Sequence, residues 1–166
     1  QFLTAIGITV LEGYGMTETS AVISIRRLNK PTPGTVGTPI PGYEVCLKDD
    51  KGNLVTEIGQ KGSLWVKSKQ ILMGYYKRPE LNQSIFDKNG FFDTGDIMRL
   101  NHRGELSFAG RAKDTIALGG GENVEPVPIE DRLITSEFID QVMVVGDDKK
   151  SLGALIVPHF DHVRKK

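Results

Sequence analysis

The stretch "IMRLNHRGELSFAG", residues 97–110, decides the fold class. Apolar residues alternate with polar ones on both sides of a turn that contains Gly104. Alternation with a period of two is typical of a strand that buries one face, and a glycine between two such runs is typical of a hairpin turn. The stretch therefore predicts an antiparallel β-hairpin.

Upstream of this hairpin, short β-type runs and turn residues alternate. Many of the 19 glycines stand between such runs, which is the spacing of consecutive hairpins. The Pro- and Gly-rich segment at 26–42 is predicted to be irregular. A short helix with proline in its first turn is predicted from Pro79. Strands are predicted at 6–11, 43–48 and 62–68.

The pattern changes after Gly110, where hairpins give way to a mixed segment. The resulting β-α-β-β order predicts a separate unit, so we place a boundary at 111–114 and expect an α+β protein. The expected elements are a strand running into glycines at 115–126, a helix at 128–136 and strands at 141–146 and 152–158.

Composition excludes several classes of protein. The 21 basic and 21 acidic residues cancel, which argues against a nucleic-acid surface. The single cysteine, Cys46, cannot form an internal disulfide and fits a reducing compartment, so we expect the cytoplasm. No apolar run approaches the roughly 18 residues that span a bilayer. The N-terminus lacks an initiator methionine and the features of a signal peptide, and we expect it to be the inside of a longer protein.

The segment "VLEGYGMTETSAV" at 10–22 is the first candidate site. Glycines on both sides of Tyr14 permit close approach of a ligand to the backbone. Glu18 offers the hard oxygen that Mg²⁺ takes alongside phosphates. The local alternative, which these residues alone favour, is a helix cap in which Thr17 satisfies the first amides. The segment is not a dinucleotide fingerprint, and the chain has no Walker-type loop.

Two further segments carry candidate residues. In "GFFDTGDIMRL" at 90–100, a carboxylate at a strand start could accept both ribose hydroxyls of a nucleotide, whereas turn composition favours Asp93 bonding backbone amides. In "GRAKDTIALGGGENVEPVPIE" at 110–130, Arg111 could clamp a phosphate or ribose. The three glycines at 119–121 could turn their amides to a ligand or let a thin substrate arm pass close by. The alternative is a strand-to-helix turn that needs positive φ.

The remaining candidates are interpreted as structural residues. Trp65 is expected in the hairpin core, and Tyr75 and Tyr76 are expected to be packing aromatics. His159 and His162 have too few companions for a zinc site. Cys46 lies within a predicted strand without a histidine partner, so no nucleophilic role is expected.

The order and spacing of these motifs carry a resemblance. "GYGMTET", "FFDTGD" and "GRAKDTIALGGGENVEP" together resemble the adenylate-forming superfamily of acyl-CoA synthetases, peptide-synthetase adenylation domains and beetle luciferases. With "ILMGYYKRPE" and "VMVVGDDKKSLGALIVPHF" included, the chain looks most like the AMP-forming long-chain fatty acid–CoA ligases. The resemblance runs through essentially the whole chain.

The resemblance implies a domain organisation and a reaction. Residues 1–110 would be the β-rich end of a large N-terminal domain, with hairpins and a distorted barrel. Residues 111–114 would be a hinge, and residues 115–166 the first part of a small mobile α/β domain. The substrates would be ATP, a fatty acid or other carboxylic acid, and coenzyme A, with Mg²⁺ as the metal ion. Acyl-AMP would form first, and the CoA thiol would then displace AMP.

The resemblance also implies roles for individual residues. Tyr14 would stack on adenine, Thr17 would contact phosphate, and Glu18 would hold Mg²⁺. Gly15 and Met16 would border the acyl carboxylate. Asp96 and Arg111 would hold the ribose hydroxyls, and Lys113 would be the hinge about which the small domain rotates. The pantetheine arm of CoA would pass Gly119, Gly120, Gly121 and Glu122.

Two features of the family are not found in this sequence. Its phosphate loop and its catalytic lysine have no counterpart, since Lys165 and Lys166 lack the expected context. We therefore expect an excised piece that is inactive alone. One alternative is adenylation without CoA transfer, as in acyl-AMP ligases or peptide-synthetase domains. Another is a non-catalytic β-rich nucleotide-binding or interaction module. Membrane contact stays open for an enzyme with apolar substrates, although no amphipathic anchor is visible.

Overall fold

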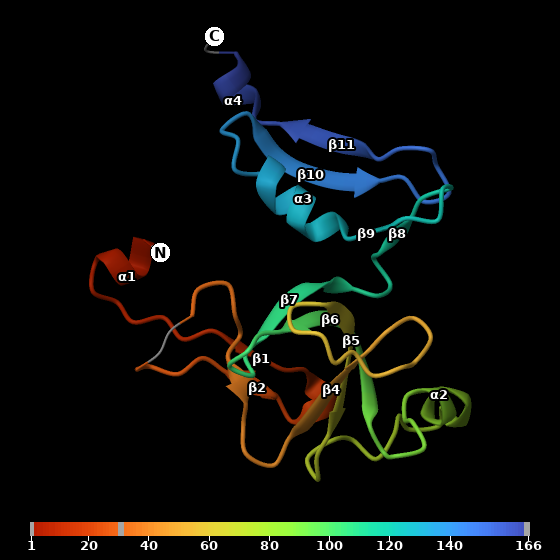
Figure 1. Ribbon diagram of the computed structural model, residues 1–166. Coiled ribbons are helices and arrows are strands. Elements are labelled where there is room, and N and C mark those ends of the chain that lie inside the picture. The colour runs from red at the N-terminus through yellow and green to blue at the C-terminus, as the bar shows by residue number, and fades with distance from the viewer. Residues whose placement is uncertain (1, 30–31, 165–166) are drawn as a thin grey trace. The chain divides into compact units, whose positions relative to one another are not determined.

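The computed structural model describes residues 2–29 and 32–164 (Figure 1). The chain divides into two compact units, Gln1–Phe108 and Ala109–Lys166, here called unit 1 and unit 2. The division falls within the strand that ends the hairpin predicted at 97–110. Among the described residues, no helix has the length and apolar character needed to cross a bilayer.

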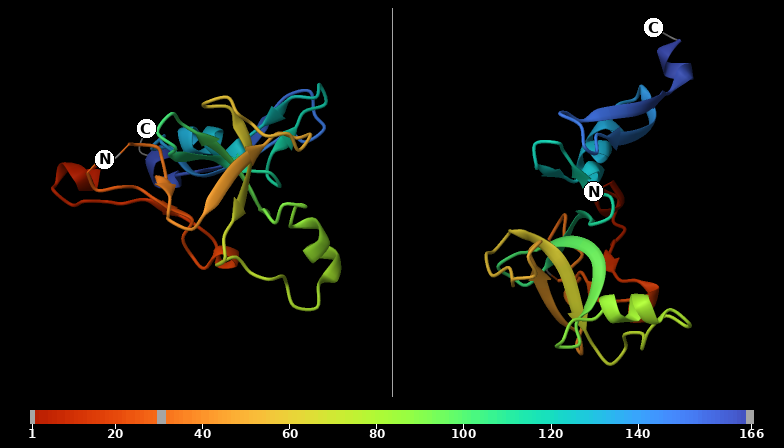
Figure 2. Two further views of the ribbon diagram at one scale, coloured as in Figure 1. Left: turned by 60° about the horizontal axis from the view of Figure 1, so that its bottom comes forward. Right: turned by 90° about the vertical axis from the view of Figure 1, so that its right-hand side faces the viewer.

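Unit 1 is built around a four-stranded sheet in the order β4-β5-β6-β7. The strands are β4 (Glu44–Lys48), β5 (Lys61–Lys67), β6 (Phe92–Leu100) and β7 (Leu106–Arg111). The predicted strands at 43–48 and 62–68 and the hairpin at 97–110 are thus confirmed. β6 curves along its length (Figure 2). The predicted distorted barrel is not a closed barrel, because β4 and β7 are the two edges of the sheet in the described part of the chain.

The core of unit 1 lies on one face of this sheet. Along β5 and β6 buried side chains alternate with more exposed ones, as expected for strands that are covered on one face. Trp65 does not lie in this core, contrary to prediction. It lies on the opposite face, where the Lys48 ammonium is 3.6 Å from the centroid of its ring. The buried apolar cluster consists of Ile23, Tyr43, Leu47, Leu64, Val66, Phe92, Met98 and Leu106.

A small second sheet in unit 1, in the order β1-β2-β3, carries the first candidate site. Its strands are β1 (Gly13–Tyr14), β2 (Ser24–Ile25) and β3 (Thr38–Pro39). It adjoins β7 through an antiparallel bridge between Gly37 and Leu106. The strand predicted at 6–11 is wrong. Helix α1 (Phe2–Ala5) comes first, and Ile6 and Ile8 are then 57% and 50% exposed without a partner strand among the described residues.

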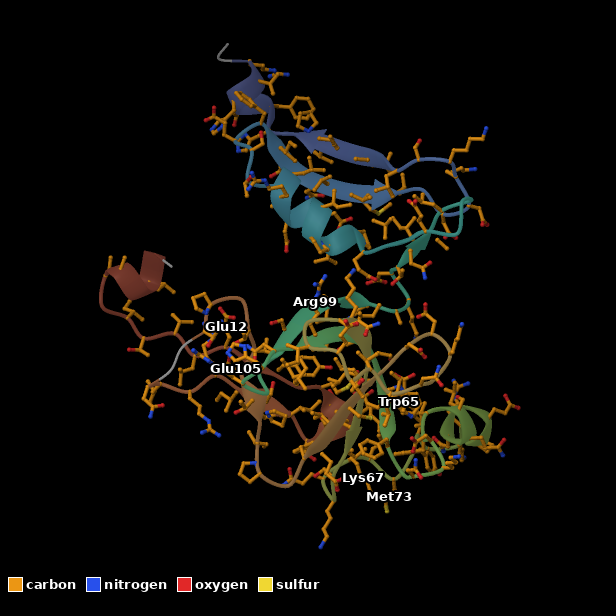
Figure 3. All side chains as sticks on the ribbon, in the orientation of Figure 1. Glu12, Trp65, Lys67, Met73, Arg99 and Glu105 are labelled. Atoms are coloured by element: carbon orange, nitrogen blue, oxygen red, sulfur yellow. The ribbon has the colours of Figure 1, made fainter. Side chains whose placement is uncertain are left out.

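Polar contacts hold residues 26–29 and 32–37, the described part of the Pro- and Gly-rich segment that precedes β3. Arg26 is only 8% exposed, and it donates to the Glu12 carboxylate at 2.6 Å and to the Thr35 carbonyl. Thr32 donates to Glu105, which lies in the turn between β6 and β7. The side chains of Glu12 and Glu105 are labelled in Figure 3. These bonds fix the chain directly before β1, and so fix where Tyr14 lies.

Unit 2 differs from the predicted β-α-β-β order at its start, because the single strand predicted at 115–126 is instead a hairpin of two short strands. The helix and the two strands that follow come in the predicted order. Strands β8 (Ile116–Ala117) and β9 (Asn123–Val124) form a hairpin, and β10 (Ile139–Val145) pairs antiparallel with β11 (Gly153–Pro158). Helix α3 (Pro126–Leu133) packs against β10, and the Glu130 carboxylate accepts a hydrogen bond from the Val144 amide at 2.7 Å. A short helix α4 (Phe160–Val163) follows β11. In unit 1, the helix predicted from Pro79 is α2 (Pro79–Ser84).

Candidate functional site

Tyr14 and Asp96 meet in unit 1 although 82 positions separate them in the sequence. The Tyr14 hydroxyl donates to Asp96 Oδ2 at 2.6 Å. Asp96 is 5% exposed because it occupies the inward-facing register of β6, in the alternation that also buries Phe92 and Met98. A buried carboxylate needs hydrogen-bond donors, and Tyr14 at the end of β1 supplies one. The structure thus brings together the two segments expected to bind adenine and ribose.

The "DTGD" segment at 93–96 does not form the turn that its composition favours, and it follows directly after Phe92, the first residue of β6. It lies inside β6, at a shift of register between Ser63 and Trp65. Gly95 adopts φ +70°, which is typical of glycine in a β-bulge. Asp93 Oδ1 accepts the Gly95 amide and the Ser63 hydroxyl, so part of the turn interpretation holds for Asp93. Of the two aspartates in this segment, Asp96 is buried and Asp93 is half-buried.

Gly15 fixes the path of the chain directly after Tyr14. A Cβ atom at this position would lie 1.8 Å from the carbonyl oxygen of Ala21, so only glycine fits. The turn that follows is the 3₁₀ helix η1 (Thr17–Thr19). Met16 is half-buried and packs against the core of unit 1. Gly15 thereby lets the chain fold back on itself and present η1 at the surface.

The hydroxyl that closes η1 belongs to Thr19, and not to Thr17 as the capping interpretation had it. Thr19 Oγ1 accepts the Met16 amide at 3.2 Å and lies 3.0 Å from the Met16 carbonyl, to which it can donate. Tyr43 from the core donates to the Thr19 carbonyl. Thr17 is exposed, and its hydroxyl has no hydrogen-bond partner in the described part of the chain. That hydroxyl is therefore available for a ligand.

Glu18 is half-buried and is oriented by one long-range contact. The Tyr75 hydroxyl donates to Glu18 Oε1 at 2.8 Å. Burial and this bond to a carboxylate both raise the pKa of Tyr75, which keeps its proton on the phenol. Among residues 2–29 and 32–164, Glu18 Oε2 has no hydrogen-bond partner. Tyr75 was predicted to be a packing aromatic, and its partner lies 57 positions away, where no local pattern points.

The oxygen atoms around Glu18 could bind a metal ion whose other ligands are phosphate oxygens of a substrate and water. The described residues contain no cluster of three or more His, Cys, Asp or Glu side chains that could hold a metal ion. Mg²⁺ is commonly bound by one or two carboxylates together with phosphate oxygens and waters. One carboxylate with an open oxygen, next to an exposed threonine hydroxyl, is therefore compatible with Mg²⁺ that arrives with a polyphosphate.

The other predicted site residues belong to unit 2. Arg111 is the last residue of β7, and Lys113 is exposed in the turn after it. The amides of Gly119 and Gly121 donate to the carbonyls of Lys149 and Leu118, and Gly121 has φ +86°. These two amides are therefore used within unit 2. The glycines lie in the hairpin turn between β8 and β9 and not in a strand-to-helix turn, although the positive φ expected of such a turn is present at Gly121.

Gly120 and Glu122, also in this loop, are exposed. A Cβ atom at Gly120 would meet nothing within 4 Å. The loop therefore has room beside it for a ligand.

Glu125 is a buried residue that the sequence did not bring to attention. It is 7% exposed and accepts the Thr115 hydroxyl at 3.0 Å. A Cβ atom at Gly110 would lie 2.3 Å from Glu125 Oε2, so Gly110 makes room for this carboxylate. The only sequence signal was the glycine before Arg111. The Thr115 hydroxyl also lies 3.1 Å from the carbonyl of Arg111, so Thr115 links the end of β7 to Glu125 at the start of α3.

The remaining titratable candidates stay outside the site. The rings of His159 and His162 stack at 4.2 Å between centroids, and His162 Nδ1 lies 2.9 Å from the Glu137 carbonyl. Cys46 is half-buried in β4, and burial raises the pKa of its thiol. A raised pKa disfavours the nucleophilic thiolate, as expected for a structural cysteine.

Nearly the whole of this chain matches part of larger known proteins. A long-chain-fatty-acid–acyl-carrier-protein ligase of Arabidopsis thaliana, named as chloroplastic, is 38% identical over 175 residues, which cover 99% of this chain and 24% of the relative. A long-chain-fatty-acid–CoA ligase of Mycobacterium bovis is 37% identical over 155 residues, which cover 93% and 24%. The chain thus spans about a quarter of the length of these curated relatives.

Solved structures agree with these relatives. The O-succinylbenzoate coenzyme A synthetase of Bacillus subtilis in complex with AMP is 30% identical, with a TM-score of 0.82 over 95% of this chain and 33% of that chain. The same enzyme in complex with ATP and a magnesium ion gives a TM-score of 0.81 at 29% identity.

Two family models match separate parts of the chain. The AMP-binding enzyme family matches residues 1–76, and the AMP-binding enzyme C-terminal domain matches residues 113–166. Both halves of the sequence therefore match the same group of proteins, and the chain belongs to the AMP-binding enzymes.

Proposed function

We propose that the chain is part of an AMP-forming acid–thiol ligase that acts on long-chain fatty acids. A carboxylate oxygen of the acid attacks the α-phosphorus of ATP, and pyrophosphate leaves. The sulfur of a thiol then attacks the acyl carbon, and AMP leaves with the oxygen that came from the acid. The observation that carries this proposal is the hydrogen bond between Tyr14 and Asp96, which joins two motifs of the family.

Tyr14, Asp96 and Arg111 are the proposed nucleotide-binding residues. The Tyr14 ring stacks on adenine, while its hydroxyl stays bonded to Asp96. Asp96 accepts from the ribose hydroxyls with help from Arg111, a role that suits a carboxylate and a guanidinium. The burial of Asp96 and its 2.6 Å contact with Tyr14 support this assignment.

Thr17 and Glu18 are the proposed phosphate and metal residues. The exposed Thr17 hydroxyl donates to a phosphate oxygen, and Glu18 holds Mg²⁺ that arrives with ATP. When bound, Mg²⁺ neutralises charge on the phosphates during the displacement. The open Oε2 atom of Glu18 and the complex of a 29% identical relative with ATP and magnesium support this role.

The remaining proposed roles concern the acid and the thiol. Gly15 and Met16 border the acyl carboxylate, because they separate Tyr14 from the phosphate residues. Lys113 is the hinge about which the small domain rotates after acyl-AMP has formed and before the thiol attacks. The loop of Gly119, Gly120, Gly121 and Glu122 lines the path of the pantetheine arm, for which the open space beside Gly120 gives support.

The thiol acceptor has two candidates with one chemistry. One relative is named as a ligase to CoA, and the other as a ligase to acyl-carrier protein. In both acceptors the attacking group is a phosphopantetheine thiol. We propose CoA as the acceptor. Acyl-carrier protein is the alternative, and it is supported by the 38% identity between 99% of this chain and the ligase named for acyl-carrier protein. Thioester yield from the two thiols at equal concentration decides between them.

The proposed location is the cytoplasm. A single half-buried cysteine fits a reducing compartment. The relative named as chloroplastic makes the plastid stroma a competing location, which cell fractionation distinguishes.

Calorimetry with AMP tests the nucleotide site. The full-length protein should bind AMP, and Asp96→Ala and Arg111→Ala should each weaken binding by on the order of 10-fold or more, because a charged hydrogen-bonding group is removed. Glu57→Ala, which changes an exposed carboxylate in a turn of unit 1, is the control. Equal AMP affinity in all four proteins would show that Asp96 and Arg111 do not bind ribose.

A further inference from the structure

The loop at 70–76 docks on η1 through three hydrogen bonds. The Leu72 amide donates to the Glu18 carbonyl at 2.8 Å, and the Ser20 hydroxyl donates to the Gln70 carbonyl at 2.8 Å. The third bond runs from the Tyr75 hydroxyl to Glu18 Oε1. Two of these bonds fix the backbone, and the third reaches the side chain that is proposed to hold the metal ion.

Asn82 from helix α2 holds Tyr75 in place. The Tyr75 amide donates to Asn82 Oδ1 at 2.7 Å, and Asn82 Nδ2 donates to the Tyr75 carbonyl at 3.0 Å. A Cβ atom at Gly74 would lie 2.9 Å from the Asn82 side chain, so Gly74 admits this close contact. Both polar groups of one backbone residue are thereby clamped by one amide side chain. The backbone of Tyr75 is therefore held in place by residues of the protein itself.

We propose that Tyr75, clamped by Asn82, is a positioning residue that orients the Glu18 carboxylate for a metal–polyphosphate complex. This inference rests on the proposed role of Glu18. A glutamate side chain on a surface turn samples several rotamers, and a donor on Oε1 restricts that sampling. The bond also directs the remaining oxygen, Oε2, to the metal ion. Partners behind a metal ligand commonly orient it in this way.

The loop at 70–76 is held in place by contacts that do not involve the Tyr75 hydroxyl. Ile71 and Leu72 pack against the core of unit 1, whereas Tyr76 is 86% exposed and Met73 is fully exposed and projects away from the unit (Figure 3). The loop is therefore held by Ile71, Leu72 and the backbone bonds. None of these needs the phenol oxygen of Tyr75, so Tyr75→Phe should leave the loop folded.

Metal binding by the full-length protein tests the inference. Mn²⁺ replaces Mg²⁺ as the probe, and its affinity is measured by electron paramagnetic resonance in the presence of a non-hydrolysable ATP analogue. Tyr75→Phe should weaken Mn²⁺ binding by on the order of 10-fold and leave AMP affinity unchanged. Asn82→Ala should act in the same direction, and Tyr76→Phe, which changes the exposed neighbour, should have no effect. Unchanged Mn²⁺ affinity in Tyr75→Phe would overturn the inference.

The two half-reactions give a second readout. Tyr75→Phe should slow formation of acyl-AMP from ATP and should leave thioester formation from supplied acyl-AMP unchanged, because the second step does not use the metal–polyphosphate complex. Equal slowing of both steps would indicate a structural role instead.

Glu18→Gln distinguishes failure of this inference from failure of the proposed function. If Glu18→Gln keeps full Mn²⁺ affinity, the metal role of Glu18 is wrong. If Glu18→Gln weakens binding and Tyr75→Phe does not, only the positioning role is wrong. The double variant should bind no more weakly than Glu18→Gln alone, because Tyr75 acts through Glu18.

Discussion

Asp96 is a carboxylate on the buried face of a strand, and the Tyr14 phenol is a donor to it. Tyr14→Phe removes this donor and keeps the aromatic ring. We expect the free energy of unfolding to fall by roughly 1–2 kcal/mol, because a buried charged group loses one hydrogen bond. Urea denaturation measures the change, with Tyr76→Phe as the matched control at an exposed site. Equal stability of Tyr14→Phe and the control would contradict the importance of this bond.

Asp87 makes stability depend on pH in the acid range. Burial raises the pKa of its carboxyl, but hydrogen bonds from Lys48 and from the amides of Phe91 and Asn89 outweigh burial, so the pKa lies below its ordinary value. A depressed pKa in the folded state means that the stabilisation is complete above the unfolded pKa of about 3.9. It is then lost as pH falls through the folded value.

Asp87→Asn tests this dependence. We expect a loss on the order of 1–2 kcal/mol at neutral pH, because a charge-assisted bond to Lys48 is removed. The slope of unfolding free energy against pH below about pH 4 should become smaller. Asp50→Asn, at an exposed position in the turn after β4, is the control. If the unfolding free energy of Asp87→Asn depended on pH below about pH 4 in the same way as that of the unmodified protein, the prediction would be refuted.

At the residue scale, motifs in the sequence predicted candidate site residues but not the contacts that these residues make. The motifs pointed to Tyr14 and Asp96, which do meet. Tyr75 was interpreted as packing because its bond to Glu18 spans 57 positions, and no periodicity or spacing encodes such a pair. Tyr75 lies in the segment "ILMGYYKRPE", one of the motifs on which the family resemblance rests. That resemblance was the one indication from the sequence that this part of the chain matters for function.

At the element scale, the turn after β1 depends on the absence of a side chain at Gly15. In Gly15→Ala the new methyl group would overlap the Ala21 carbonyl, which is backbone and cannot rotate away. We expect a loss of roughly 1–3 kcal/mol in unfolding free energy, together with loss of acyl-AMP formation, since the turn carries Thr17 and Glu18.

Gly120→Ala is the matched control for Gly15→Ala. Its methyl group would meet open space at an ordinary backbone conformation, so stability should change by less than about 0.5 kcal/mol. If both variants were equally stable, the steric account of Gly15 would be wrong.

Strands were predictable where alternation and pairing coincide. Burial alternates with a period of two along β5 and β6, and the structure confirms the strand predicted at 62–68 and the hairpin predicted at 97–110. The apolar run at 6–11 has the composition of a strand but no partner among the described residues, and composition cannot supply one. The register shift at Gly95 was likewise hidden, because "DTGD" has the composition of a turn.

At the scale of the whole molecule, the chain divides into two units within β7, and the turn that carries Lys113 follows β7 in unit 2. Lys113→Pro fixes φ near −65° and removes an amide that donates no hydrogen bond within residues 2–29 and 32–164. If this turn is a hinge, the variant should form acyl-AMP normally and should form thioester at least about 10-fold more slowly. Lys113→Ala, which leaves φ free, should form thioester as fast as the unmodified protein. Equal rates in both variants would exclude a hinge at this position.

The fate of one oxygen atom tests the central claim most directly. The full-length protein is supplied with ATP, CoA and a long-chain fatty acid whose carboxylate is labelled with ¹⁸O, and the phosphorus products are analysed by mass spectrometry. Attack of the carboxylate on the α-phosphorus predicts one ¹⁸O atom in AMP and none in pyrophosphate. Label in inorganic phosphate with ADP as the other product, or AMP that carries no label, would contradict the account.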